Sequence, residues 1–217
     1  MADYTVQQGD YLSKIAHQFG YSDYRVIWDH PQNADLKKKR KNPNILFPGD
    51  RLFVPEKDSK EEPGPTETKH RFELQAQKLM LRLVLEDAYN RPIADAPCEL
   101  TVDGATFKLL SDGKGKIEQE IPATAQSATL IIKDAVTPVQ DQVIPIDIGS
   151  LDPVEEVSGQ KARLANLGYF MGSPDEDNEE LFRSAVEEFQ CEHMGAAAVD
   201  GKCGPKTQAK LKEVHGC

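Results

Sequence analysis

The chain has 217 residues, a formal net charge of −10 and 39% hydrophobic residues, which predicts a soluble globular protein with room for two or three small domains. Its apolar runs are only a few residues long, far short of the ~20 residues that cross a bilayer, so we expect no membrane insertion. The N-terminal stretch MADYTVQQGD has neither a basic segment nor an apolar one. We therefore expect synthesis in the cytoplasm without a secretory signal peptide.

The first 56 residues predict a strand, two helical regions and a second strand, in that order. From Leu12 onward the apolar residues fall at i, i+3, i+4 and i+7, the spacing of an amphipathic helix. We expect Asp10 to cap this helix at its N-terminus and Gly20 to end it. A second helical region is interrupted at Pro31, and a tight turn at 48–50 leads into the closing strand. In so short a segment the two strands must pair antiparallel to close a core.

Five consecutive basic residues, 37–41, make this first segment the most basic part of the chain. Such a run is most often a solvated helix end or loop. Because the sequence contains no further basic stripe with interleaved aromatic residues, we expect no nucleic-acid partner.

The stretch KDSKEEPGPTET, residues 57–68, has no apolar residue and two prolines. This composition predicts a flexible linker, so we expect residues 1–56 to reorient against the remainder of the chain. The junction near residue 150 is short and apolar, and we expect it to attach residues 150–217 more firmly to the domain before it.

Residues 69–149 predict a small β domain of six or seven short strands with regularly spaced turns. Asp103-Gly104 lies between two alternating runs, which is a strong hairpin signal, and Asp112-Gly113 precedes another strand. Both aspartates have the oxygen ligands that calcium prefers, but Asp-Gly at a hairpin is far more often a matter of backbone geometry. We expect no metal there.

Residues 150–217 change to helical spacing and predict three helices. Leu164 lies in the first, while Leu181 and Phe189 are expected to face inward from the second; Pro205 begins the third. Three of the four cysteines lie here, beside two histidines. A zinc site, a disulfide such as Cys191–Cys203, and free thiols all remain open, although no C-x-x-C spacing favours zinc.

The sequence contains none of the common catalytic or nucleotide-binding motifs, and the three segments account for the whole chain. The acidic stretch PDEDNEE has the composition of a solvated loop rather than of two carboxylates on opposite sides of a cleft. We therefore expect a protein that is not an enzyme and has no cofactor.

Two stretches, YTVQQGDYLSKIAHQFG and NPNILFPGDRLFVP, resemble the beginning and the end of a LysM domain. The resemblance implies a shallow groove between two loops that binds glycans containing N-acetylglucosamine, such as peptidoglycan or its fragments. We expect one of Ile45 and Leu46 to point into the core and the other outward. By position, the resemblance assigns the groove to Gly9, Asp10, Tyr11, Leu12, Asn44, Ile45 and Leu46.

Two further resemblances complete the chain. The stretch EDAYNRPIADAPCELTVDGATFKLLSDGKGKIEQEIP is similar to the transthyretin-like fold, which usually serves as a spacer or adhesion module. The stretches RLANLGYFMG, SAVEEFQCEHMG and VDGKCGPKTQAKL resemble a three-helix peptidoglycan-binding module. The expected fold class is therefore α+β and multidomain: a LysM-like βααβ domain (1–56), a linker (57–68), an all-β transthyretin- or immunoglobulin-like sandwich (69–149) and a helical domain (150–217).

The arrangement as a whole resembles accessory proteins of type VI secretion or phage-like contractile systems. It implies a bacterial peptidoglycan-binding protein that such a system delivers to the periplasm or outside the cell. The alternative is a structural adaptor that docks onto spike, baseplate or effector proteins and binds no sugar.

Overall fold

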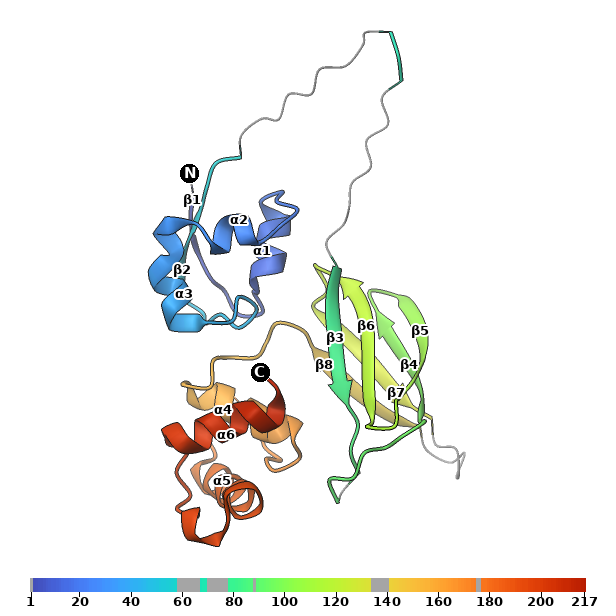
Figure 1. The fold of residues 1–217 in the computed structure, drawn as a ribbon, viewed down its shortest axis with the longest axis vertical. Helices are drawn as coiled ribbons and strands as arrows, with labels where there is room; N and C mark the ends of the chain where they lie inside the picture. Colours follow the sequence, from blue (N-terminus) through green and yellow to red (C-terminus); the bar gives the residue numbers. More distant parts are fainter. Residues whose placement is uncertain (1, 58–66, 70–77, 88, 134–140, 175–176) are drawn as a thin grey trace. The chain divides into compact units, whose positions relative to one another are not determined.

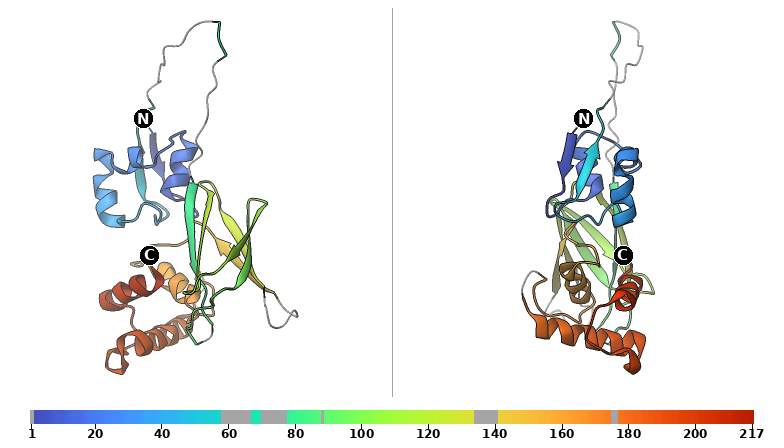
Figure 2. Two further views of the ribbon diagram at one scale, coloured as in Figure 1. Left: turned by 45° about the vertical axis from the view of Figure 1, so that its right-hand side comes forward. Right: turned by 90° about the vertical axis from the view of Figure 1, so that its left-hand side faces the viewer.

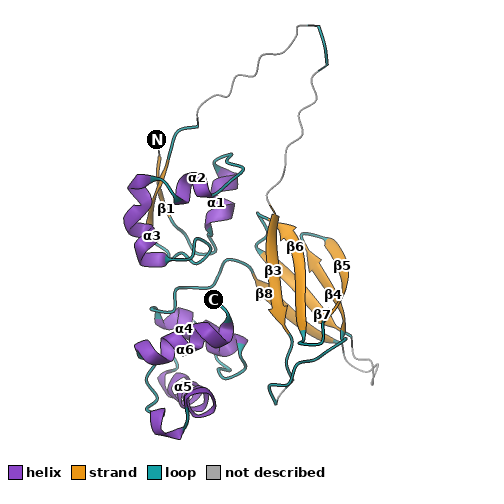
Figure 3. Cartoon of the chain, viewed as in Figure 1, coloured by secondary structure: helices purple, strands orange, loops and turns teal. Residues whose placement is uncertain are grey.

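The helices lie toward the two ends of the chain and most of the strands in its middle, as Figure 3 shows. The computed structural model describes residues 2–57, 67–69, 78–87, 89–133, 141–174 and 177–217. Most of the predicted linker, residues 58–66, and part of the acidic loop, residues 175–176, lie outside the described residues. The described part has an α+β fold with six α-helices and eight strands. Residues Met1–Gly149 form one compact unit and Ser150–Cys217 a second.

Two paired strands and three short helices build the first domain (Figure 2). Strand β1 (Ala2–Thr5) pairs antiparallel with β2 (Arg51–Val54), which confirms the predicted pairing. The helices between them are α1 (Leu12–Gln18), α2 (Arg25–Trp28) and α3 (Ala34–Arg40), and a 3-10 turn at Pro31–Asn33 marks the predicted interruption.

Helix α1 turns its apolar face into the core of this domain. Leu12, Ile15 and Ala16 are fully buried there, and Gly20 follows the helix at a φ of +75°, a conformation that favours glycine. The expected N-cap is wrong. Tyr11 occupies the N-cap position without a capping side-chain bond, because the Asp10 carboxylate accepts instead from the Tyr4 hydroxyl and the Gln7 N–H.

Two antiparallel sheets form the β domain, residues 78–149 (Figure 1). One sheet pairs β3 (Lys78–Val84) with β6 (Lys116–Pro122). The other has the order β5 (Ala105–Leu110), β4 (Pro97–Val102), β7 (Ser127–Ile132) and β8 (Gln142–Asp147). Alternate residues of both sheets meet in one apolar core, among them Leu100, Ile117, Ile121 and Leu130.

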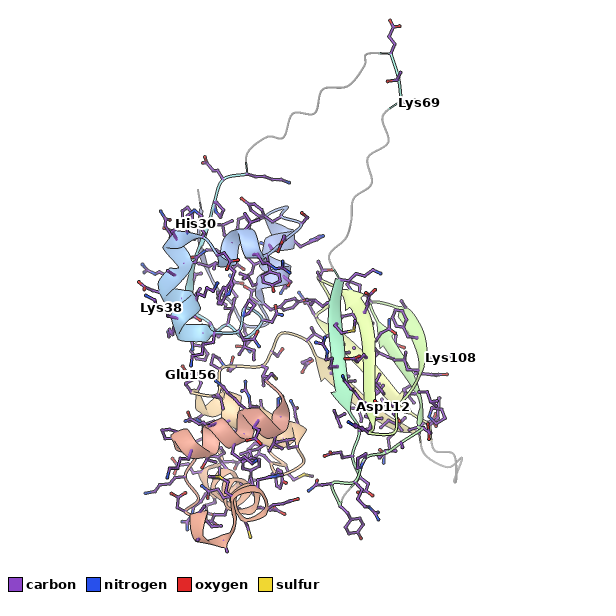
Figure 4. All side chains as sticks on the ribbon, in the orientation of Figure 1. His30, Lys38, Lys69, Lys108, Asp112 and Glu156 are labelled. Atoms are coloured by element: carbon purple, nitrogen blue, oxygen red, sulfur yellow. The ribbon has the colours of Figure 1, made fainter. Side chains whose placement is uncertain are left out.

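The two Asp-Gly signals of the β domain mark turns. Asp103 and Gly104 both have positive φ in the β4–β5 hairpin, the geometry of a tight two-residue turn. In the turn between β5 and β6, where Figure 4 labels Asp112, its carboxylate accepts from the N–H groups of Lys114 and Lys116, both at 2.8 Å. These hydrogen bonds also lower the pKa of Asp112. The hydrogen bonds within the turn therefore explain why an aspartate occupies position 112.

Three helices pack around a separate core in residues 150–217: α4 (Val157–Asn166), α5 (Glu179–Met194) and α6 (Pro205–His215). Leu164, Phe189 and Leu211 lie at its centre. Leu181 does not face inward as expected, since its side chain is 51% exposed. The neighbouring Phe182 packs against the core in its place.

Candidate functional site

Two loops of the first domain meet at the N-terminus of α1. The Leu12 N–H donates to the Pro43 carbonyl at 3.2 Å, which joins the turn at residues 7–11 to the loop at residues 42–50. In the second loop the Asn42 carboxamide accepts from the Asn44 N–H at 3.0 Å. At its far end the Gly49 N–H donates to the Val6 carbonyl at 2.9 Å. Backbone hydrogen bonds therefore fix the distance between the two walls of the predicted groove.

The seven residues assigned to glycan binding lie in these two loops but differ in exposure. Of the Ile45–Leu46 pair, Leu46 lies in the core and Ile45 is half-buried. Asn44 is the exposed residue among the seven, and its carboxamide oxygen lies 3.5 Å from the Ser13 hydroxyl. The buried members are Asp10, Tyr11, Leu12 and Leu46, and the half-buried ones are Gly9 and Ile45.

Asp10 serves to hold the first loop. Its carboxylate accepts from the Tyr4 hydroxyl at 2.6 Å and from the Gln7 N–H at 3.0 Å, and it pairs with the Lys14 ammonium at 3.2 Å. Burial raises the pKa of Tyr4 to about 12, and the hydrogen bond to Asp10 adds to the shift. With three partners inside the domain, the carboxylate acts as a structural anchor of the turn.

Tyr11 differs most from its expected place. Only 1% of its surface is exposed, and its hydroxyl lies 2.7 Å from the Ala125 carbonyl and 2.9 Å from the Ala123 carbonyl, both in the β domain. Burial raises the pKa of Tyr11 to about 12, with the negative charge of Asp103 adding to the shift. The contact lies within the compact unit Met1–Gly149. Most of the predicted linker lies outside the described residues, so the expected reorientation of residues 1–56 stays a prediction.

One residue of the basic run 37–41, Arg40, is buried, whereas the whole run was expected to be solvated. Arg40 is buried and forms an ion pair with Asp50, whose carboxylate also accepts from the Phe47 N–H at 3.0 Å. Burial acts to raise the pKa of Asp50, but the hydrogen bonds from Arg40 and Phe47 outweigh it and lower the pKa below its usual value. Lys38 fits the expectation, with its side chain on the outer face of α3 in Figure 4.

In the helical domain the buried Gln190 joins the stretch SAVEEFQCEHMG to the stretch VDGKCGPKTQAKL. The Gln190 carboxamide donates to the Asp200 carboxylate at 2.8 Å and lies 3.0 Å from the Thr207 hydroxyl. Its carbonyl oxygen accepts from the N–H groups of Asp200 and Gly201. One side chain of α5 therefore fixes the loop that leads into α6.

All four cysteines are free thiols in the structure: Cys98 is buried, Cys203 half-buried, and Cys191 and Cys217 are exposed. Within the described residues no group of three or more His, Cys, Asp and Glu side chains could hold a metal ion. The described helices are also too short or too polar for any of them to span a membrane.

Comparison with known protein families finds one match near each end of the chain. A family model described as LysM domain matches residues 4–23, and one described as putative peptidoglycan binding domain matches residues 154–211. Neither match extends into the β domain. No curated protein and no solved structure shows significant similarity. The chain thus contains a LysM region and a peptidoglycan-binding region, and these domains support cell-wall binding.

Proposed function

We propose that this is a bacterial, non-enzymatic protein that binds peptidoglycan through two domains, one at each end of the chain. The observation that carries the proposal is that each matched region belongs to a domain with its own apolar core. Two weak sites on one chain raise the apparent affinity for a polymer, because the second site binds at a high effective concentration.

The chemistry of the first site suits an N-acetylglucosamine unit. An acetamido group needs hydrogen-bond partners for its N–H and carbonyl and a small apolar wall for its methyl group. The exposed amide of Asn44 and the half-buried side chain of Ile45 lie next to each other and provide both. Gly9, across the groove, adds backbone without a side chain to obstruct a sugar.

The β domain acts as a transthyretin-like spacer in this proposal. The six strands among its described residues, the Asp103-Gly104 hairpin and the turn at Asp112 support this likeness.

The setting we propose is a contractile injection system of the type VI or phage-like kind, with delivery to the periplasm or outside the cell. The order of the three domains supports it. The test compares culture supernatants of the producing strain with and without an active contractile apparatus. Protein released equally in both would remove this setting and leave wall binding untouched.

Co-sedimentation of the full-length protein with purified, insoluble peptidoglycan tests the binding. We expect the protein in the pellet and no soluble muropeptides released over prolonged incubation. Asn44→Ala should weaken binding about fivefold, which corresponds to the loss of one hydrogen bond of ~1 kcal/mol. Gln18→Ala, which changes an exposed amide on α1, is the control. Release of muropeptides would show an enzyme instead.

A structural adaptor is the second candidate, favoured by the burial of four of the seven assigned residues. In that case the exposed surfaces bind spike, baseplate or effector proteins. Full-length protein that stays in the supernatant with peptidoglycan, and binds immobilised purified spike protein, would decide for the adaptor.

A further inference from the structure

Tyr11 belongs to the glycan-binding turn of the first domain by sequence and to the β domain by its contacts. Its hydroxyl lies 2.7 Å from the Ala125 carbonyl and 2.9 Å from the Ala123 carbonyl. Both alanines are buried, with 0% and 2% of their surface exposed. A phenol has one proton, so the two carbonyls share it, and each would lose its partner if Tyr11 withdrew.

The ring of Tyr11 packs where the β domain has no side chain. A Cβ atom built on Gly149 would lie 2.3 Å from Tyr11 Cδ1 and 3.2 Å from the Gly9 carbonyl oxygen. The glycine therefore allows the backbone of the β domain to cover both the ring and the adjoining turn. The β domain thus covers the side of the turn on which Gly9 and Tyr11 lie.

The contact is local. Next to the turn lies an open recess of about 280 Å³, lined by residues of both domains that include Ser13, Arg25 and Leu79. Side chains around an open recess do not pack against each other across it, so this side adds little to the contact. Tyr11 is thus a buried contact between the two domains.

We propose that the β domain is an internal partner of the LysM turn and competes with the glycan for it. A glycan strand that uses the Gly9–Tyr11 side of the turn must first displace the Tyr11 contact. The closed form, in which Tyr11 contacts the β domain, therefore binds peptidoglycan less tightly than the open form, in which this contact is broken. This inference rests on the proposed function. It adds that affinity is set by the fraction of molecules in which Tyr11 has left the β domain.

The hydroxyl of Tyr11 can be removed without changing the size of the ring. Tyr11→Phe leaves the carbonyls of Ala123 and Ala125 without this donor in the closed form, which shifts the equilibrium toward the open form. The loss of the hydrogen-bond donor to these buried carbonyls should change the equilibrium constant between the closed and open forms by about tenfold. We expect Tyr11→Phe to bind insoluble peptidoglycan about tenfold more tightly than the wild type. Tyr21→Phe is the matched control, since the Tyr21 hydroxyl donates to the Pro55 carbonyl within the first domain.

A second variant acts from the other side of the contact. Gly149→Ala places a methyl group against the Tyr11 ring and should also tighten binding, although it changes nothing in the first domain. Gly149 has a φ of +83°, so alanine is strained there; Gly104→Ala, at +81° with open space around it, controls for that strain. Circular dichroism of each variant confirms that the strands and helices remain.

The outcomes separate the two ideas. Tighter binding by Tyr11→Phe and Gly149→Ala, with both controls equal to the wild type, supports the competition. Equal or weaker binding by these two variants overturns it while leaving the proposed function in place. If no variant and no wild-type protein sediments with peptidoglycan, the proposed function fails and the competition fails with it.

Discussion

The Arg40 guanidinium donates two hydrogen bonds to the Asp50 carboxylate, from Nε at 2.6 Å and from Nη2 at 3.0 Å, and both side chains are buried. The pair connects the end of α3 to the loop that carries Asn44 and Ile45. Two charges removed from water depend on each other, because the loss of one leaves the other buried and unpaired.

Asp50→Asn should therefore destabilise the first domain by about 3–5 kcal/mol, the usual effect of breaking a buried ion pair. The chain has one tryptophan, Trp28, which is buried in this domain. Its fluorescence during urea denaturation reports on this domain alone. Asp29→Asn disrupts the exposed pair with Lys37 and should change the free energy of unfolding by less than about 1 kcal/mol. Equal effects of the two substitutions would contradict the prediction.

The same pair predicts a pH dependence. The pKa of Asp50 is lower in the folded protein than its ordinary value of 3.8, so the unfolded chain takes up the proton first as the pH falls. The stabilisation is therefore present above pH 3.8 and is lost as the pH falls below it. We expect the difference in stability between wild type and Asp50→Asn to be constant from pH 7 to pH 5 and to shrink below pH 3.8. A difference that grows on acidification would have the wrong sign.

Gln190 gives a second test, in the helical domain. Gln190→Leu keeps the approximate shape of the side chain but leaves the N–H groups of Asp200 and Gly201 without their acceptor. We expect a loss of roughly 1–3 kcal/mol, since each of the two lost hydrogen bonds contributes about 0.5–1.5 kcal/mol. Hydrogen exchange over residues 199–204 measures it. Gln208→Leu is the control, because Gln208 is half-buried and donates one hydrogen bond, to the Cys203 carbonyl. Unchanged protection of the loop in Gln190→Leu would show that the glutamine does not hold it.

Local signals in the sequence predicted much of the fold. The spacing from Leu12 to Phe19 defined α1, and Gly20 defined its end. The Asp103-Gly104 pair defined a hairpin, because few other dipeptides adopt positive φ at both positions. These features depend on residues a few positions apart, and a single sequence displays such relationships directly.

Contacts between distant residues were the part that could not be predicted. Tyr11 bonds to carbonyls more than a hundred positions away, and the loop position of a tyrosine normally indicates exposure. Arg40 was one of five basic residues in a row, with nothing in the run to single it out as the buried one. Leu181 and Phe182 both suit the apolar face of α5, and the packing of the domain selects Phe182. In each case the deciding partner lies outside the local pattern; for Arg40 it is Asp50, ten positions further on.

The thiols should differ in reactivity. Burial raises the pKa of Cys203 to about 11 and also raises the pKa of Cys98, whereas Cys191 is exposed. Since the thiolate is the nucleophile, only about one Cys203 in a thousand is reactive at pH 8. We expect iodoacetamide at pH 8 to label Cys191 first and Cys98 and Cys203 far more slowly, as measured for each site by mass spectrometry. Cys191→Ser should remove the fast phase; a fast phase that persists on Cys203 would refute the order.

His215 predicts a pH dependence of the helical domain. Burial, with the charge of Arg163 adding to it, lowers the pKa of His215 to about 4. Its Nε2 lies 3.0 Å from the Asn166 carboxamide nitrogen, so the ring is held in place while neutral. As the pH falls below 6.5 the unfolded chain takes up a proton that the folded domain takes up only near pH 4. The domain should therefore lose stability between pH 6.5 and pH 4 and change no further below that through this group. His215→Gln keeps a polar side chain without the titration, so its stability should be flatter over this range. An NMR titration of the His215 ring checks the cause directly, and a midpoint near 6.5 would refute it.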